Sequence, residues 1–169
     1  MIFSYSEMVK NKIKKVNVCY NTLYDNGKKF IFQKIKEFAN TINELFIERL
    51  FLFNNDIEIL FYSNDSKFSM KNCNGIIIYT KTKDKIYLLL ICINNKYRNI
   101  GYGSIFLQEF IDYIRNKYKN KKIILHSIEQ TIGFYKKAGF IEILEKPIKY
   151  KKLFKYEKYD KNIKLLELY

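Results

Sequence analysis

The sequence predicts an α/β fold built from two successive strand–helix units. The first unit opens with an unbroken apolar run at 86–93, which has the length of a strand. Apolar residues then recur at helical spacing over 105–118, and a turn with two glycines joins the two elements. The second unit is a strand at 121–127 followed by a short helix within 130–139.

The remaining elements follow from local patterns in chain order. Alternation at 14–20 predicts a first strand, and Asp25–Gly27 predicts a turn. Helical spacing over 30–53 predicts one long helix or two helices broken near 40–43. Gly75 is expected to mark a β-bulge in its strand. The other predicted strands are 57–62, 73–80, 140–144 and 163–168.

The glycine turn precedes a helix, which suits it to hold a phosphate. The first N–H groups of a helix have no internal partner, and the helix dipole adds partial positive charge there. Gly101 and Gly103 have no Cβ, so a ligand can approach the backbone closely. Two other phosphate loops do not fit, because a dinucleotide-binding loop needs glycine where Phe106 stands and a P-loop needs lysine where Ser104 stands.

Two motifs carry a family resemblance. Arg98 stands three residues before Gly101 in R-x-x-G-x-G, which resembles the acetyl-CoA pyrophosphate loop of the GCN5-related N-acetyltransferase (GNAT) superfamily. About 30 residues later, Tyr135, Gly139 and Phe140 match that superfamily's short fourth helix, A-x-x-x-Y-x-x-x-G-F. The order and separation of the two motifs strengthen the resemblance.

The resemblance covers roughly 73–145, which we expect to be the acetyl-CoA-binding core of a single GNAT domain spanning 1–169. It implies an α/β (α+β) fold with a mixed twisted sheet of about six to seven strands and about four helices. The central strand is expected to splay from its neighbour and leave a V that holds pantetheine.

The resemblance also implies a set of acetyl-CoA contacts. Unpaired backbone groups of Ile91, Cys92 and Ile93 are expected to bond the pantetheine amides. Phe134 and Tyr135 are expected beside acetyl-CoA on the fourth helix. The pyrophosphate is expected on the loop Arg98, Asn99, Ile100, Gly101, Tyr102, Gly103 and Ser104.

Catalytic roles are implied for three residues. Tyr135 matches the superfamily tyrosine that points at the CoA sulfur, and a phenol with a pKa of about 10 can protonate the leaving thiolate. The central-strand glutamate that serves as the base in the histone-acetylating branch of the superfamily is replaced by Tyr87. In the NatE-type protein N-terminal acetyltransferases, a central-strand tyrosine and a histidine on the next strand order a water that takes the amine proton. Tyr87 and His126 are similar in position, which favours a protein N-terminal α-amine as acceptor.

Other acceptors and a non-enzymatic role stay open. The run 130–139 also resembles glucosamine-6-phosphate N-acetyltransferase, but Leu89 and Leu90 replace the acidic pair of that enzyme's central strand. Another small amine, or a CoA-binding module without turnover, would fit the same loop. The substrate loop of the NatE type is not recognisable, because no proline precedes Pro147. The segment Pro147–Tyr159 is expected to be a loop over the acceptor site or a solvated hairpin.

Charge, hydropathy and cysteine content indicate which classes of partner to expect. The net charge is +14, but lysines are spread along the chain, so we expect no nucleic-acid partner. No apolar run approaches the length of a membrane span, and the first residues do not resemble a signal peptide. Three separated cysteines and one histidine predict buried thiols in a reducing, cytoplasmic compartment and no metal site. We therefore expect acetyl-CoA, as co-substrate, and an amine acceptor as the partners; the sequence does not set an oligomeric state.

Overall fold

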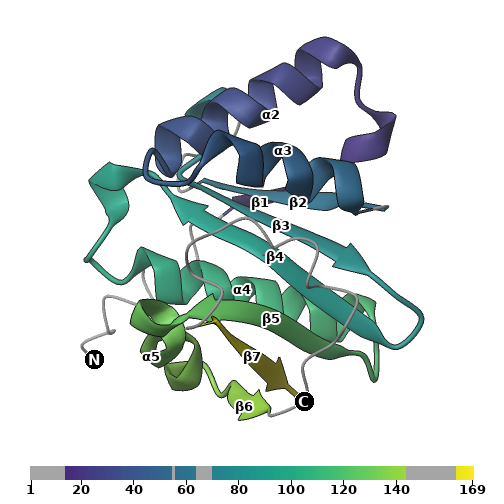
Figure 1. Cartoon of the computed structure of the whole chain (residues 1–169), viewed down its shortest axis with the longest axis vertical. Coiled ribbons are helices and arrows are strands. Elements are labelled where there is room, and N and C mark those ends of the chain that lie inside the picture. The colour runs from purple at the N-terminus through teal and green to yellow at the C-terminus, as the bar shows by residue number, and fades with distance from the viewer. Residues whose placement is uncertain (1–13, 55, 64–69, 144–162) are drawn as a thin grey trace.

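A computed structural model of the chain describes residues 14–54, 56–63, 70–143 and 163–169 (Figure 1). Within these residues seven strands form one mixed sheet in the order β1-β2-β3-β4-β5-β7-β6. All neighbouring strands are antiparallel except β4 and β5, which are parallel. The strands are β1 (Lys14–Cys19), β2 (Glu58–Ser63), β3 (Gly75–Lys81), β4 (Lys85–Ile93), β5 (Lys122–Ile128), β6 (Ile141–Ile143) and β7 (Ile163–Leu168).

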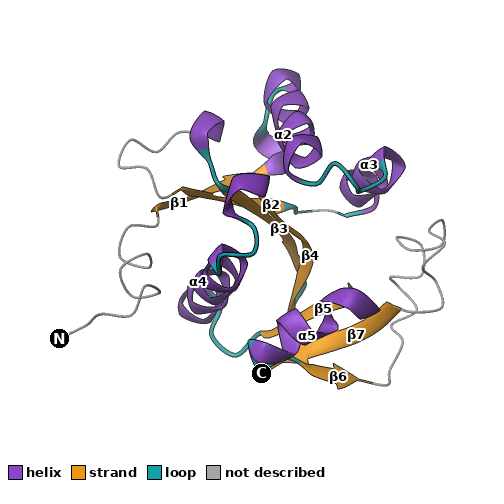
Figure 2. Ribbon diagram, turned by 90° about the vertical axis from the view of Figure 1, so that its left-hand side faces the viewer, coloured by secondary structure: helices purple, strands orange, loops and turns teal. Residues whose placement is uncertain are grey.

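Helices cover both faces of the sheet. Figure 2 shows α2 and α3 on one side of β1–β4 and α4 on the other, with α5 beside β5 and β7. The helices are α2 (Asp25–Phe38), α3 (Glu44–Phe53), α4 (Tyr102–Lys117) and α5 (Glu129–Lys137). Short 3₁₀ turns are η1 (Tyr20–Thr22), η2 (Met70–Asn72) and η3 (Asn95–Tyr97). No helix of the described residues is both long enough and apolar enough to span a membrane.

The sheet divides the core into two clusters. The α4-side cluster is centred on Phe106, Phe110 and Ile114 of α4 and includes Ile86 and Leu88 of β4. The acceptor-side cluster, named for the side on which the resemblance leads us to expect the acceptor, packs α2 and α3 against the opposite face. Its members include Ile31, Ile35, Phe38, Ile47, Leu50, Tyr87, Leu90, Cys92 and Ile124.

A β-bulge in β4 changes the course of the central strand. Ile78 of β3 pairs with Leu90, but the next residue, Tyr79, pairs with Leu88, so Leu89 has no opposite residue on β3. A bulge bends its strand and increases the local twist. The sequence placed the bulge at Gly75, which was wrong. Gly75 is needed for another reason, because a Cβ there would overlap the ring of Phe106.

The strands β4 and β5 part where the bulge begins. Their pairing runs only from Lys85 with Lys122 to Leu88 with Leu125. The segment 89–93 of β4 has no paired residues on β5. The predicted splay of the central strand is therefore confirmed.

The other elements agree with most of the sequence predictions. The pattern over 30–53 forms two helices, and the Asn43 side chain caps α3 by accepting the Leu45 N–H at 2.9 Å. The turn predicted at Asp25–Gly27 was wrong, because these residues form the first turn of α2. The helix expected from 105 begins earlier, at Tyr102. The segment Pro147–Tyr159 lies outside the described residues.

Candidate active site

The glycine turn forms the N-terminal end of α4. Gly101 is the N-cap residue with φ of +87°, a left-handed conformation that favours glycine, and Asn99 is also left-handed with φ of +61°. A Cβ at Gly101 would meet no atom within 4 Å, so the backbone is open to a ligand. No side chain caps this helix and its first turn has no acidic residue. The first N–H groups of α4 are therefore available to an anion, as a pyrophosphate requires.

The same turn lies close to β4 and α5. A Cβ on Gly103 would lie 3.2 Å from Ile93 Cδ1 and 3.4 Å from Phe134 Cε2, so little space is left there. Tyr102 is buried and its ring contacts Tyr97, with centroids 5.0 Å apart. Tyr102 can therefore offer only its backbone to a ligand, whereas Ile100 is half exposed.

Arg98 makes contacts that the sequence did not predict. Its Nε donates to the carbonyl oxygen of Ile93 at 3.2 Å, and its Nη2 donates to the carbonyl oxygen of Phe38. The sequence could not reveal the second partner, because it is a backbone atom 60 residues away with no side-chain signature. Pyrophosphate binding by Arg98 stays a prediction.

The expected pantetheine contacts lie on the part of β4 that has left β5. Ile91 and Ile93 are half-buried against the α4-side cluster. Cys92 points to the opposite cluster, where its Sγ lies 3.8 Å from the Ile76 carbonyl oxygen. Burial raises the pKa of the Cys92 thiol to about 12, so this thiol is not a nucleophile at neutral pH.

Tyr87 and His126 are in contact across the neighbouring strands β4 and β5. The Tyr87 hydroxyl and His126 Nδ1 share a hydrogen bond, and the two rings meet edge to face with centroids 5.7 Å apart. Both residues lie on the acceptor side of the sheet, since Tyr87 belongs to that cluster and His126 is two residues after Ile124, which also does. Burial lowers the pKa of His126 to about 4, so its imidazole is neutral at pH 7.

Tyr135 packs on α5 against the α4-side cluster. Its ring contacts Phe134, with centroids 5.0 Å apart, and Phe140, with centroids 5.8 Å apart. Burial raises the pKa of the Tyr135 phenol, so the hydroxyl keeps its proton at neutral pH. Gly139 closes α5 with φ of +95°, as the sequence predicted.

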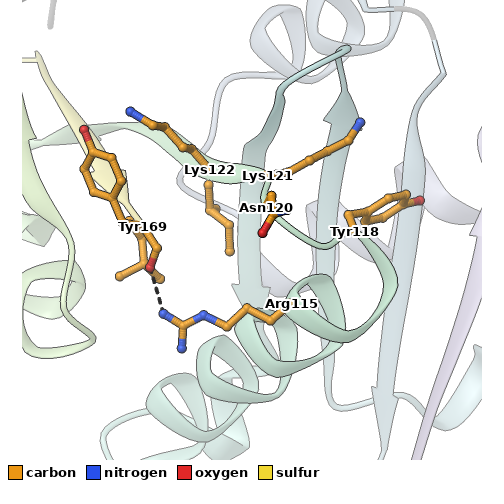
Figure 3. A pocket seen from close by; sticks show the side chains of 8 residues that line it. Arg115, Tyr118, Asn120, Lys121, Lys122 and Tyr169 are labelled. Atoms are coloured by element: carbon orange, nitrogen blue, oxygen red, sulfur yellow. Dashed lines mark hydrogen bonds between the residues drawn. The ribbon is translucent and has the colours of Figure 1, made fainter.

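A pocket of about 400 Å³ lies at the other end of α4 (Figure 3). Arg115 crosses it and donates to the main-chain oxygen of Tyr169 at 2.9 Å. The 16 residues of α4 separate this pocket from the glycine turn by about 24 Å at 1.5 Å per residue, so it is no part of the candidate site. Among the described residues, no group of three or more His, Cys, Asp or Glu side chains could hold a metal ion.

Comparison with known proteins decides the family. The family described as "Acetyltransferase (GNAT) domain" matches residues 28–162. The chain belongs to the GNAT acetyltransferase family. It is therefore an acetyl-CoA-dependent N-acetyltransferase that acts on an acceptor substrate. The seven-stranded mixed sheet and the four α-helices of the described residues form the GNAT fold.

Solved structures share this fold at low sequence identity. An acyl-CoA N-acyltransferase from Pseudomonas aeruginosa superimposes with a TM-score of 0.66 at 12% identity, over 93% of this chain and 99% of that one. Tetrahymena GCN5 superimposes with a TM-score of 0.65 at 19% identity, over 92% of this chain and 95% of that one. For the ribosomal-protein-S18-alanine N-acetyltransferase from Escherichia coli, the TM-score is 0.61 at 13% identity, over 92% of this chain and 93% of that one. No curated protein matches the sequence.

Proposed function

We propose that this GNAT enzyme transfers the acetyl group of acetyl-CoA to a protein N-terminal α-amine. The observation that carries the proposal is the hydrogen-bonded pair of Tyr87 and His126 on the acceptor side of the sheet. The rest of the central strand after Tyr87 offers no carboxylate or imidazole that could accept the amine proton, because 88–93 is wholly apolar.

The protonation state of the acceptor supports an α-amine over a lysine. At pH 7.4 about one third of α-amines with a pKa of about 7.7 are neutral, against about one in a thousand lysines with a pKa of about 10.4. His126, with a pKa of about 4, is a weak base and would not deprotonate a lysine ammonium. It suits an acceptor that already arrives neutral and loses its proton only as the new bond forms.

The reaction would proceed by direct attack. The amine nitrogen attacks the thioester carbonyl carbon, a C–N bond forms, and the C–S bond breaks. The proton from the amine passes through water to the Tyr87–His126 pair, and Tyr135 gives its proton to the leaving thiolate. A backbone N–H within Ile91–Ile93 would stabilise the oxyanion, and positioning of the two substrates would supply much of the rate.

The similar solved structures do not indicate which acceptor this enzyme uses. One solved structure is named for an alanine of ribosomal protein S18, and another is titled a histone acetyltransferase, yet both share the same fold. Identities of 13% and 18% extend no acceptor to this chain. The choice depends on the side chains of β4 and β5.

A CoA-release assay with acetyl-CoA tests the proposal. Wild type, His126→Ala and Tyr135→Phe would be run against N-terminal peptides, the same peptides with blocked N-termini and an internal lysine, glucosamine 6-phosphate and polyamines. Tyr113→Phe removes a hydroxyl near the far end of α4 and serves as the matched control. We expect turnover of free N-termini that falls in both site variants and not in the control.

Other outcomes would decide against the proposal. Turnover of the sugar phosphate alone would make this a small-amine enzyme and leave His126 a structural residue. Turnover of the blocked peptides would favour lysine. Binding of CoA without turnover of any acceptor would favour a CoA-binding module.

A further inference from the structure

We propose that Arg98 is a positioning residue that couples the acetyl-CoA loop to the acceptor-side helices. Through it, acetyl-CoA bound at the glycine turn would order the α2–α3 corner, defined here as residues 39–43 between α2 and α3. The inference concerns any acceptor and does not depend on the choice of an N-terminal amine.

The first contact is at the end of α2. Phe38 is the last residue of α2, and the last carbonyls of a helix have no partner inside it. The Phe38 carbonyl oxygen accepts a hydrogen bond from Arg98 Nη2. A cation at this end also opposes the partial negative charge of the helix dipole. The helix is therefore capped by a residue that belongs to the acetyl-CoA loop.

The second contact fixes the same guanidinium to the central strand. Arg98 Nε donates at 3.2 Å to the carbonyl oxygen of Ile93, the last residue of β4. The main chain of Arg98 closes η3, because its N–H donates to the Asn95 carbonyl oxygen at 3.2 Å. The guanidinium is planar and rigid, so two bonds from it define the distance and orientation between its partners. It joins the loop, the end of β4 and the end of α2.

The α2–α3 corner is continuous with the core on the acceptor side of the sheet. Phe38 and Ala39 are buried in the cluster that also contains Tyr87. The corner is closed by the Ala39 N–H, which bonds the Ile35 carbonyl oxygen at 2.8 Å, and by the Ile42 N–H, which bonds the Ala39 carbonyl oxygen at 2.9 Å. A displacement at Phe38 therefore moves the helices that pack on Tyr87.

Such a connection has a measurable consequence. If acetyl-CoA holds the loop, it holds Arg98, and the corner becomes more ordered. Thermodynamic linkage then requires the acceptor and acetyl-CoA to strengthen each other's binding by the same factor. We expect the acceptor to bind more tightly to the CoA complex than to the free protein, and CoA to bind more tightly when the acceptor is present.

Hydrogen exchange of the full chain with and without CoA tests this inference, since no acceptor is needed. In wild type, CoA should slow exchange at the Ala39 and Ile42 amides. No change at these amides would overturn the proposal without any variant. The same comparison would be made with Arg98→Met and Arg98→Lys, and with Lys96→Met, which removes an exposed cation from η3.

The lysine variant separates charge from geometry. Lysine keeps the positive charge beside the loop but lacks the planar fork, so exchange would be compared at CoA concentrations that saturate each protein. At saturation with CoA, the slowing at the corner should be lost, and the KM for the acceptor should rise by about fivefold or more, a larger factor than any change in kcat. Lys96→Met should resemble wild type in both measurements. If Arg98→Lys or Arg98→Met keeps the CoA-dependent slowing, Arg98 does not couple the two regions.

Discussion

Tyr87 and His126 share a hydrogen bond at the point where β4 and β5 stop pairing. The last paired residues are Leu88 and Leu125, so His126 is the first residue of β5 beyond the paired segment. The pair therefore lies at the base of the opening between the strands, on the acceptor side. Parallel pairing over four residues holds the two backbones in place.

A double-mutant cycle tests whether this pair acts as one unit. General acid–base groups contribute about 10²–10⁴-fold to a rate, so His126→Gln and Tyr87→Phe should each lower kcat strongly. Residues that act as a unit have non-additive effects. The double variant should therefore be no slower than the worse single variant. Two effects that multiply would mean that the residues act independently.

Tyr135→Phe should separate chemistry from binding. The phenol keeps its proton because burial raises its pKa, and its loss removes the proposed donor to the thiolate. We expect kcat to fall by at least about 100-fold. The ring contacts with Phe134 and Phe140 remain, so the CoA Kd should change little. Isothermal titration with CoA gives that Kd, and an unchanged kcat would exclude Tyr135 as the acid.

The stability of the protein should fall in mild acid because of His126. Its pKa is about 4 in the folded protein and about 6.5 when unfolded, so the unfolded state binds more protons between these values. The stabilisation is complete above pH 6.5 and is lost as the pH falls toward 4, by at most about 3 kcal/mol. His126 is the only histidine of the chain, so His126→Gln removes the histidine contribution to the pH dependence and leaves the other titrating groups in place.

Urea unfolding at several pH values between 7.5 and 4.5 measures this effect. The difference in unfolding free energy between wild type and His126→Gln should shrink as the pH falls. A constant difference would mean that His126 is not held neutral by the fold.

Gly75→Ala should destabilise the protein through a single clash. The new methyl group would overlap the ring of Phe106, which stacks on Tyr62 with centroids 4.7 Å apart. Overpacking of this kind costs about 1–3 kcal/mol. Phe106→Leu should be destabilising alone but should recover part of the loss when combined with Gly75→Ala. Thermal unfolding of the four proteins checks this, and additive losses would show that the clash is relieved elsewhere.

Glu58 should be the most costly polar residue to replace. Burial alone would raise the pKa of this carboxyl, but hydrogen bonds to it outweigh burial and hold the pKa well below its usual range. The donors are Tyr79 at 2.7 Å, Asn17 at 2.6 Å, Lys81 at 3.0 Å, Lys117 at 3.1 Å and Tyr118 at 2.9 Å.

Glu58→Gln keeps the size of the side chain but removes its charge. Loss of one partner from a fully buried ion pair costs about 3–5 kcal/mol. Because the Lys81 and Lys117 side chains are 42% and 40% exposed and can regain water, we expect about 2 kcal/mol here. Glu44→Gln, at the pair with Lys36 whose side chains are 57% and 44% exposed, is the control and should cost less than about 1 kcal/mol. Equal losses would show that the buried network adds nothing.

The sequence predicted the elements whose residues carry a periodic or chemical signal. The glycine turn and the helix that Gly139 closes both depend on local backbone preferences. Asp25–Gly27 was predicted as a turn because these residues favour turns, but the acidic first turn and the packing of α2 outweigh that preference. The bulge at Leu89 could not be predicted from composition, because one additional leucine in an apolar strand has the same sequence pattern as a regular strand.

For the candidate site, the resemblance placed Tyr87 and His126 on adjacent strands, and the structure shows that their side chains share a hydrogen bond. The contact of Arg98 with Phe38 could not be predicted, because it joins a side chain to a backbone atom across the fold. Sequence patterns show which side chains can do chemistry. They do not show which distant carbonyl a long side chain will reach.

The parting of β4 and β5 also bears on how the protein behaves without its substrate. Beyond Leu88, the edge of β4 that faces β5 is a strand edge without a pairing strand among the described residues. Such edges are templates on which another chain can add a strand. Acetyl-CoA lying along 89–93 would occupy that edge as a missing strand would. We therefore expect the enzyme to be less prone to aggregate with acetyl-CoA bound than without it.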